Sequence, residues 1–227
     1  MTSDSGPLNA HGFELLSGLL GVFHRQQLID ELGTLPAGCA GQRELLDQLW
    51  CQTLVGRLRK VPCLSMHLTP DLVAVQCTLF EKSPDRNWLV TLHQDLAIPV
   101  ARRVPDPTLT GWSVKGGRHF VLAPPEVLSG MLAVRLHLDD ATEADGGLRF
   151  VPGSHRDGVL DDEGIRRRRA DAGELAVDAR AGDVLLLLPL VLHASSKARS
   201  SRGLRRVLHL LFGPPELPHG LQWRTAV

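Results

Sequence analysis

The chain has 227 residues, of which 43% are hydrophobic and 22% are charged, so it can bury one substantial core. Its 25 Lys and Arg residues balance 25 Asp and Glu residues, which argues against a nucleic-acid-binding or membrane-surface protein. The four cysteines lack the spacing of a zinc site or a disulfide framework, and residues 1–10 lack the basic and apolar regions of a signal peptide. We therefore expect a cytoplasmic globular protein with reduced thiols and a small-molecule partner.

Two helices are predicted before residue 70. Apolar residues recur at helical spacing over residues 13–32 and 43–59, and a stretch rich in Gly, Pro and Ala connects them. From residue 71 onward, short apolar runs alternate with clusters of Gly, Pro and Asp, which is typical of a β-barrel or sandwich. The predicted strands are residues 72–80, 88–92, 131–138, 148–151, 174–177, 183–188 and 206–212.

Two long stretches without a clear pattern interrupt the strands, at residues 99–127 and 154–173. Long loops in a compact domain are usually functional, so we expect these two to form lids. The order of elements predicts a mainly β fold with flanking helices. We expect a single domain over residues 1–227, with residues 1–70 as a helical support and residues 71–213 as a jelly-roll, cupin-like barrel.

The tripeptide His93-Gln94-Asp95 follows a predicted strand, and His193 follows another hydrophobic run. Side chains two positions apart point the same way from a strand. Two imidazoles and one carboxylate on one face of a metal, with the other positions open, are the ligands of non-haem Fe(II) oxygenases. Because His-x-Asp is common by chance, the alternative is a surface His93 and a packed core His193.

A candidate anion site lies just downstream. Arg205 and Arg206 begin the last strand, and Ser195 follows the histidine at position 193 by two residues. An inward guanidinium there would suit bidentate capture of a carboxylate, with the serine hydroxyl as a further donor. The alternative is that both arginines are exposed members of the basic stretch 197–206.

Several blocks occur in a fixed order: residues 92–96 (Leu-His-Gln-Asp-Leu), 138–142 (Leu-Asp-Asp-Ala-Thr), 146–155 (Gly-Gly-Leu-Arg-Phe-Val-Pro-Gly-Ser-His), 182–183 (Gly-Asp) and 193–195 (His-Ala-Ser), the last followed by Arg205. Together they resemble the signature of the phytanoyl-CoA dioxygenase family over residues 72–212. The resemblance implies a double-stranded β-helix and an Fe(II)- and 2-oxoglutarate-dependent oxygenase that uses O2.

The resemblance also implies roles for individual residues. His93, Asp95 and His193 would be the iron ligands and the catalytic centre. Arg205, with Ser195, would hold the distal carboxylate of 2-oxoglutarate, and the arginine at position 206 is the second candidate for that role.

The pocket around the iron has further candidates. Gln76 resembles a position of the family that lines the 2-oxoglutarate pocket. Thr91 would face the same pocket, because it precedes the first iron-ligating histidine by two residues. Arg135 and His137 share one face of their strand and would contact substrate if that face is the barrel interior. Trp112, in the first long loop, would close over the substrate.

We therefore predict an oxygenase that hydroxylates an unactivated C–H bond of a small metabolite, with release of succinate and CO2. An amino acid or a specialised-metabolism intermediate is the expected substrate. The aspartate of the triad argues against halogenation, which in related enzymes requires a small residue in its place. Two other functions are a non-catalytic jelly-roll binding protein and a cupin-type metalloenzyme that does not use 2-oxoglutarate.

Overall fold

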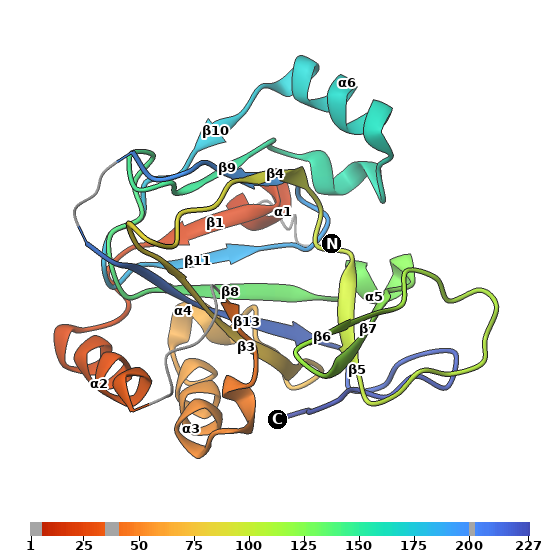
Figure 1. Ribbon diagram of the computed structural model, residues 1–227, viewed down its shortest axis with the longest axis horizontal. Helices are drawn as coiled ribbons and strands as arrows, with labels where there is room; N and C mark the ends of the chain where they lie inside the picture. The colour runs from red at the N-terminus through yellow and green to blue at the C-terminus, as the bar shows by residue number, and fades with distance from the viewer. Residues whose placement is uncertain (1–5, 35–40, 200–202) are drawn as a thin grey trace.

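The protein is described by a computed structural model over residues 6–34, 41–199 and 203–227. Its framework is a large antiparallel sheet that crosses the middle of the molecule (Figure 1). In spatial order its strands are β1 (Phe13–Leu16), β11 (Val184–Leu187), β8 (Leu132–His137), β13 (Arg205–Gly213), β3 (Val73–Lys82) and β2 (Gly41–Gln42).

A second antiparallel sheet lies above the first in Figure 1. Its strands, in spatial order, are β10 (Leu175–Ala176), β9 (Leu148–Phe150), β12 (His193–Ser195) and β4 (Val90–His93). Apolar side chains from both sheets, among them Phe150 and Leu185, form one buried cluster between them. Two facing antiparallel sheets of this kind are the predicted jelly-roll barrel.

The alternation of side chains along β8 explains how the large sheet is covered on both faces. Leu132, Val134 and Leu136 join a cluster with buried residues of the helices below the sheet, whereas Ala133 packs in the cluster between the sheets. Because successive strand residues point to opposite faces, Arg135 shares the inner face with Ala133. Polar residues on this face therefore point toward the barrel interior.

Helices lie below the outer face of the large sheet (Figure 1). The N-terminal helical elements are α1 (Pro7–His11), α2 (Val22–Gly33), η1 (Leu45–Asp47), α3 (Leu49–Leu58) and α4 (Pro62–Ser65). The prediction of a helix from residue 13 was wrong over its first part, because residues 13–16 form β1 and pair with β11. Gly18, at φ 68°, follows that strand, so the helix begins only at residue 22.

The two stretches predicted to be irregular contain regular structure. The first holds a three-stranded sheet, β5 (Ala97–Val100), β7 (Arg118–Leu122) and β6 (Ser113–Lys115), and the helix α5 (Pro125–Ser129). Gly116 and Gly117, at φ 57° and 73°, form the turn between β6 and β7, as a two-residue hairpin turn with positive φ requires.

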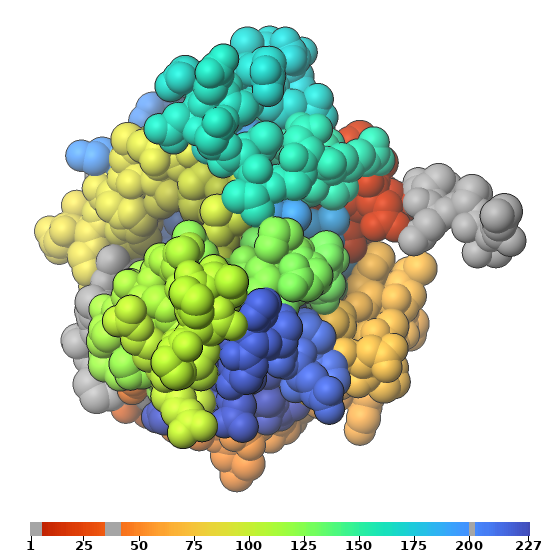
Figure 2. Space-filling view, turned by 90° about the vertical axis from the view of Figure 1, so that its right-hand side faces the viewer, coloured from red at the N-terminus to blue at the C-terminus, as the bar shows by residue number. Residues whose placement is uncertain are grey.

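The second stretch holds η2 (Ser154–Asp157) and α6 (Asp162–Ala172). Asp161 is the N-cap of α6, and its side chain accepts a hydrogen bond from the backbone N–H of Gly164. Aspartate is one of the residues preferred at this position. Figure 2 shows α6 (cyan) above the yellow-green residues of the β5–β7 region, which lie beside the blue C-terminal segment. Among the described residues, no helix has the length and apolar character needed to cross a membrane.

Candidate active site

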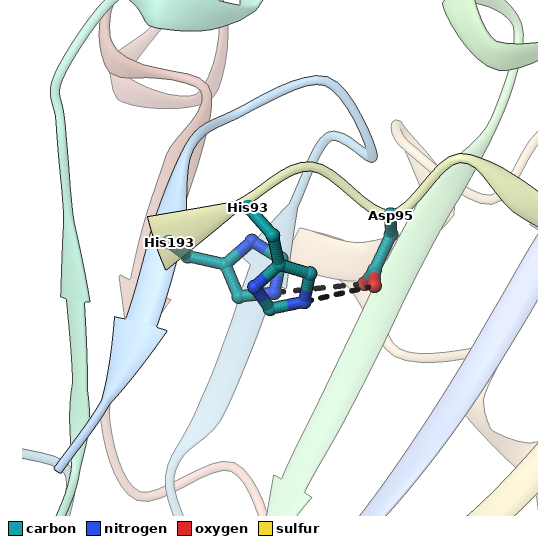
Figure 3. Close-up of side chains that lie close together, drawn as sticks. All are labelled: His93, Asp95 and His193. Atoms are coloured by element: carbon teal, nitrogen blue, oxygen red, sulfur yellow. Dashed lines mark ion pairs between the residues drawn. The ribbon is translucent and has the colours of Figure 1, made fainter. Parts of the chain in front are cut away.

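Three ligand-type side chains meet where the two strands β4 and β12 pair. His93 is the last residue of β4 and lies opposite His193, the first residue of β12. The Nε2 atoms of these histidines lie 3.5 and 3.7 Å from the Oδ1 and Oδ2 atoms of Asp95, and one ligand atom from each residue lies within 4.8 Å of the others. Figure 3 shows both rings pointing toward the carboxylate.

His193 does not lie on the strand that the preceding hydrophobic run forms. The strand β11 ends at residue 187, the chain turns at Pro189, and the histidine begins β12 in the other sheet. A proline that lacks an N–H donor suits such a crossing between sheets.

The histidine rings are oriented by their own backbone. Nδ1 of His93 lies 2.9 Å from the carbonyl oxygen of Thr91, and Nδ1 of His193 lies 3.0 Å from that of Val191. A carbonyl only accepts, so each Nδ1 carries the proton and each Nε2 presents a lone pair toward Asp95. This arrangement fixes the ligating nitrogen as it does in metal sites generally, and the donor set fits Fe(II).

The local charges favour the metal-binding form of Asp95 and His193, whereas Asp95 outweighs burial and raises the pKa of His93, so a bound metal would displace a proton there. Burial would raise the pKa of Asp95, but the nearby imidazoles of His193 and His93 outweigh it and hold that pKa well below its ordinary value. Burial lowers the pKa of His193, which favours the neutral imidazole. An ionised carboxylate beside a neutral imidazole is the state that a divalent cation requires.

Gln94 fixes the loop that carries the carboxylate. Its side chain is buried, with Nε2 donating to the carbonyl oxygens of Gly158 and Leu190 at 2.8 and 2.7 Å and Oε1 accepting from the backbone N–H of Leu160 at 2.9 Å. The middle residue of the tripeptide therefore ties the metal-ligand loop to two other segments, and its neighbours on either side point to the cavity.

We expect Gln94→Leu to destabilise the protein by about 2 kcal/mol, because it leaves two carbonyls and one N–H without their partner. Urea denaturation of the metal-free protein measures this change. The exposed Gln222 gives the control, since Gln222→Leu should stay within about 0.5 kcal/mol of the wild type. Equal stability of the two variants would show that the Gln94 bonds do not hold the loop.

The triad lines a cavity of about 490 Å³. Apolar side chains and basic side chains both line it, and Asp95 is the single acidic residue of the described lining. The apolar members are Phe80, Trp88, Val90, Leu96, Ala97, Ile98, Phe120, Leu122, Leu128, Met131, Leu148, Pro189 and Leu211, and the basic members are Arg43, Lys115, Arg135 and Arg205.

The two candidate arginines of the last strand point to opposite sides. Arg205 is 6% exposed, lines the cavity and donates from Nη1 to the carbonyl oxygen of Gly146. Arg206 instead forms a bidentate pair with Asp139, at 2.8 and 2.9 Å, on the outer face. Alternation along β13 imposes this difference.

Lys82 lies beside Arg205, outside the residues that line the cavity, and the sequence did not predict its place next to the site. It is 2% exposed, lies opposite Arg205 on the neighbouring strand, and donates from Nζ to Ser195 Oγ at 2.8 Å. Burial and the charges of Arg205 and Arg135 lower its pKa to about 7. The signal that would have found it is the alternation along β3, which places it on the same face as Gln76.

The remaining predicted residues fall into two groups. Gln76 and Arg135 line the cavity, and Ser195 lies in its wall with Oγ donating to the carbonyl oxygen of Gly146 at 2.8 Å. His137 is buried with neither ring nitrogen bonded, but it does not line the cavity. Trp112 also lies outside the lining, with Nε1 donating to a loop carbonyl at 3.1 Å.

Thr91 is exposed and does not face the cavity, which corrects the prediction. His193 pairs with His93 and Ser195 with Val90, so three residues of β12 lie opposite four of β4. This irregularity is a β-bulge, which shifts the alternation by one residue. The residue that reaches the cavity is therefore Val90.

Comparisons with known proteins agree with this geometry. A model of the family described as "Phytanoyl-CoA dioxygenase (PhyH)" matches residues 43–207. A search of curated proteins finds no significant match.

Solved structures share the fold at low sequence identity. The epimerase SnoN, in complex with Fe3+, alpha ketoglutarate and nogalamycin RO, has a TM-score of 0.67 at 17% identity over 94% of this chain and 88% of its own. The carbocyclase SnoK from nogalamycin biosynthesis has a TM-score of 0.66 at 15% identity over 92% and 82%. HygX from Streptomyces hygroscopicus, with nickel and 2-oxoglutarate bound, has a TM-score of 0.60 at 19% identity over 91% and 84%.

Proposed function

The chain belongs to the phytanoyl-CoA dioxygenase family of Fe(II)- and 2-oxoglutarate-dependent oxygenases, and we propose that it hydroxylates an unactivated C–H bond of a small metabolite. The observation that supports this most strongly is the set of two histidine Nε2 atoms and one carboxylate within 4.8 Å of one another. This set lies in a cavity whose size, about 490 Å³, suits a small molecule.

In this proposal His93, Asp95 and His193 hold Fe(II), and the enzyme consumes 2-oxoglutarate and O2. When bound, the metal and the cosubstrate supply oxidising chemistry that yields succinate and CO2 as the substrate is hydroxylated. The carbonyls behind the two histidine rings keep the ligating nitrogens aimed at one point, so the protein contributes orientation before any ligand arrives.

The far carboxylate of 2-oxoglutarate would meet the guanidinium of Arg205. Lys82 and Ser195 lie beside it, linked by the 2.8 Å hydrogen bond between Nζ and Oγ. Two buried cations form a strong site for one carboxylate, since charge-assisted hydrogen bonds strengthen away from water. Ser195, whose proton is donated to the carbonyl oxygen of Gly146, positions Lys82. Gln76 lines the same cavity as a further polar contact.

The apolar wall would position the substrate and exclude water. Phe120 and Leu122 of β7 and Met131, just before β8, line the cavity. Exclusion of water from the reacting centre protects an oxidising reaction from side reactions.

The proposed function predicts release of succinate from labelled 2-oxoglutarate in the presence of Fe(II), O2 and ascorbate. Screening a panel of small metabolites for stimulated turnover identifies the substrate, and mass spectrometry should find a product heavier by one oxygen atom. Omission of Fe(II) is the control and should remove turnover. A protein that neither binds nor consumes 2-oxoglutarate would contradict the proposal and leave a binding protein or a cupin-type metalloenzyme instead.

A further inference from the structure

Arg135 is a buried cation with no acidic partner. It is 6% exposed, lines the cavity and lies on the inner face of β8. Its Nη1 atom is 3.1 Å from Nδ1 of His209, its Cζ atom is 5.5 Å from the centre of the Phe80 ring, and its Nε atom has no hydrogen-bond partner.

The histidine beside it does not neutralise it. An arginine side chain only donates hydrogen bonds, so Nδ1 of His209 accepts and the ring is neutral. Burial, with the charge of Arg135, lowers the pKa of His209 to about 3, in agreement with that state. Among the described residues no carboxylate lies within ion-pair distance of Arg135, so its charge is not neutralised by an acidic side chain.

The group that Arg135 could pair with is separate from the carboxylate proposed for Arg205. The cross-strand neighbour of Arg135 is His209, four residues beyond Arg205 along β13. Four strand residues span about 13 Å. Arg205 already has Ser195 and Lys82 around it, whereas Arg135 faces the cavity between the metal triad and Phe80.

The buried charges of the lining lead to the same conclusion. Among the described lining residues, Arg135 and Arg205 are buried cations, and the single acidic residue is the proposed iron ligand Asp95. The two positive charges of Fe(II) and the two negative charges of 2-oxoglutarate cancel, so one buried positive charge remains for a third ligand. A buried charge is costly unless it is paired, and a ligand anion would supply the pair.

Part of the cavity lining is apolar. Ile98 of β5, Phe120 and Leu122 of β7, and Leu128 of α5 belong to it, and the exposed Lys115 lies over the Phe120 ring at 5.0 Å. The cavity therefore offers apolar contacts as well as buried cations, and the described lining residues include no second carboxylate that could bind an ammonium group.

We propose that Arg135 binds an anionic group of the substrate, so that the substrate class is a small acid with an apolar body, carrying a carboxylate or a phosphate. This inference rests on the proposed oxygenase function and narrows it. It disfavours free amino acids, whose ammonium group would meet cations.

The test uses the Ni(II)- and 2-oxoglutarate-loaded protein and probes that share one apolar body. Calorimetry compares 3-phenylpropionate, the neutral 3-phenylpropanamide and the cationic 3-phenylpropylamine, with 2-phenylethyl phosphate to distinguish phosphate from carboxylate. We expect the anions to bind at least about tenfold more tightly than the amide, because a charged hydrogen bond in a buried site contributes that much. The amine should bind most weakly.

The variants Arg135→Met and Arg135→Lys test the arginine, and Arg102→Met, at an exposed position outside the cavity lining, is the matched control. Arg135→Met should reduce the anion preference to less than about threefold, Arg135→Lys should retain part of it, and Arg102→Met should retain all of it. Thermal unfolding of each variant reports folding, and the lysine variant keeps the test valid if the methionine variant does not fold.

Binding of 2-oxoglutarate to each Ni(II)-loaded protein distinguishes the possible failures. A wild type that binds 2-oxoglutarate but shows no anion preference, or a preference that survives Arg135→Met, would overturn the inference alone. Loss of 2-oxoglutarate binding in Arg135→Met would reassign the arginine to the cosubstrate and also overturn it. A wild type that does not bind 2-oxoglutarate would overturn both the inference and the proposed function.

Discussion

Replacement of His93 by alanine is expected to weaken the binding of Fe(II) or Ni(II) by at least about 100-fold, since even loss of an outer-shell partner costs 10- to 100-fold. The variant keeps only His193 and Asp95 of the triad, so two protein ligands would have to hold the metal. Formation of succinate should fall to the background of the metal-free protein. Calorimetry with Ni(II) measures the first effect, and the labelled 2-oxoglutarate assay measures the second.

The control for this variant is His24→Ala, at an exposed position on α2. It removes an imidazole far from the cavity and should change neither metal affinity nor turnover. The side chain of His93 is 37% exposed, so its loss should leave the metal-free fold intact, which circular dichroism checks. Unchanged Ni(II) affinity in His93→Ala would remove this residue from the metal site.

The strand pattern of the sequence was sufficient to predict the barrel. Each predicted strand corresponds to a strand of the structure within a few residues, because alternation of apolar side chains persists wherever one face is buried. The first long loop was not predicted correctly. Its three short strands, such as Ser113–Lys115, are too brief to show a periodic pattern.

The grouping of His93, Asp95 and His193 was predictable because the His-x-Asp spacing and the family blocks were local in the sequence. The error at Thr91 came from a bulge, which depends on pairing with β12 and leaves no trace in the sequence of β4. Lys82 was missed for a different reason. A lysine at the end of a strand usually lies in solvent, so the alternation that places Lys82 on the face of Gln76 did not suffice to predict that it is buried opposite Arg205.

Replacement of Arg205 by methionine is expected to weaken 2-oxoglutarate binding by at least about 30-fold, because truncating one partner of a buried charge pair costs 2 kcal/mol or more. The guanidinium is 6% exposed, so water does not replace it. Affinity for Ni(II) should stay close to that of the wild type, since the triad is intact. Equal 2-oxoglutarate affinity in the variant and the wild type would refute the assignment of Arg205.

The matched variant Lys82→Met distinguishes the two cations through pH. Burial and the nearby arginines lower the pKa of Lys82 from its ordinary value to about 7, so the free protein loses this proton as the pH rises through 7. A bound carboxylate favours the protonated lysine and raises its pKa, so binding above pH 7 takes up a proton. The affinity of the wild type should therefore fall as the pH rises above 7, by up to about tenfold per pH unit.

Below pH 7 the lysine is already charged, and the affinity of the wild type should be level with pH. Lys82→Met should bind 2-oxoglutarate more weakly than the wild type below pH 7, and its affinity should not decline above pH 7. Arg205 stays charged throughout this range, because its pKa, although lowered by burial, is still about 10. Calorimetry from pH 6 to pH 9 measures both profiles. A decline that persists in Lys82→Met would mean that another group takes up the proton, and the second cation of the carboxylate site would then have to be sought elsewhere in the cavity wall.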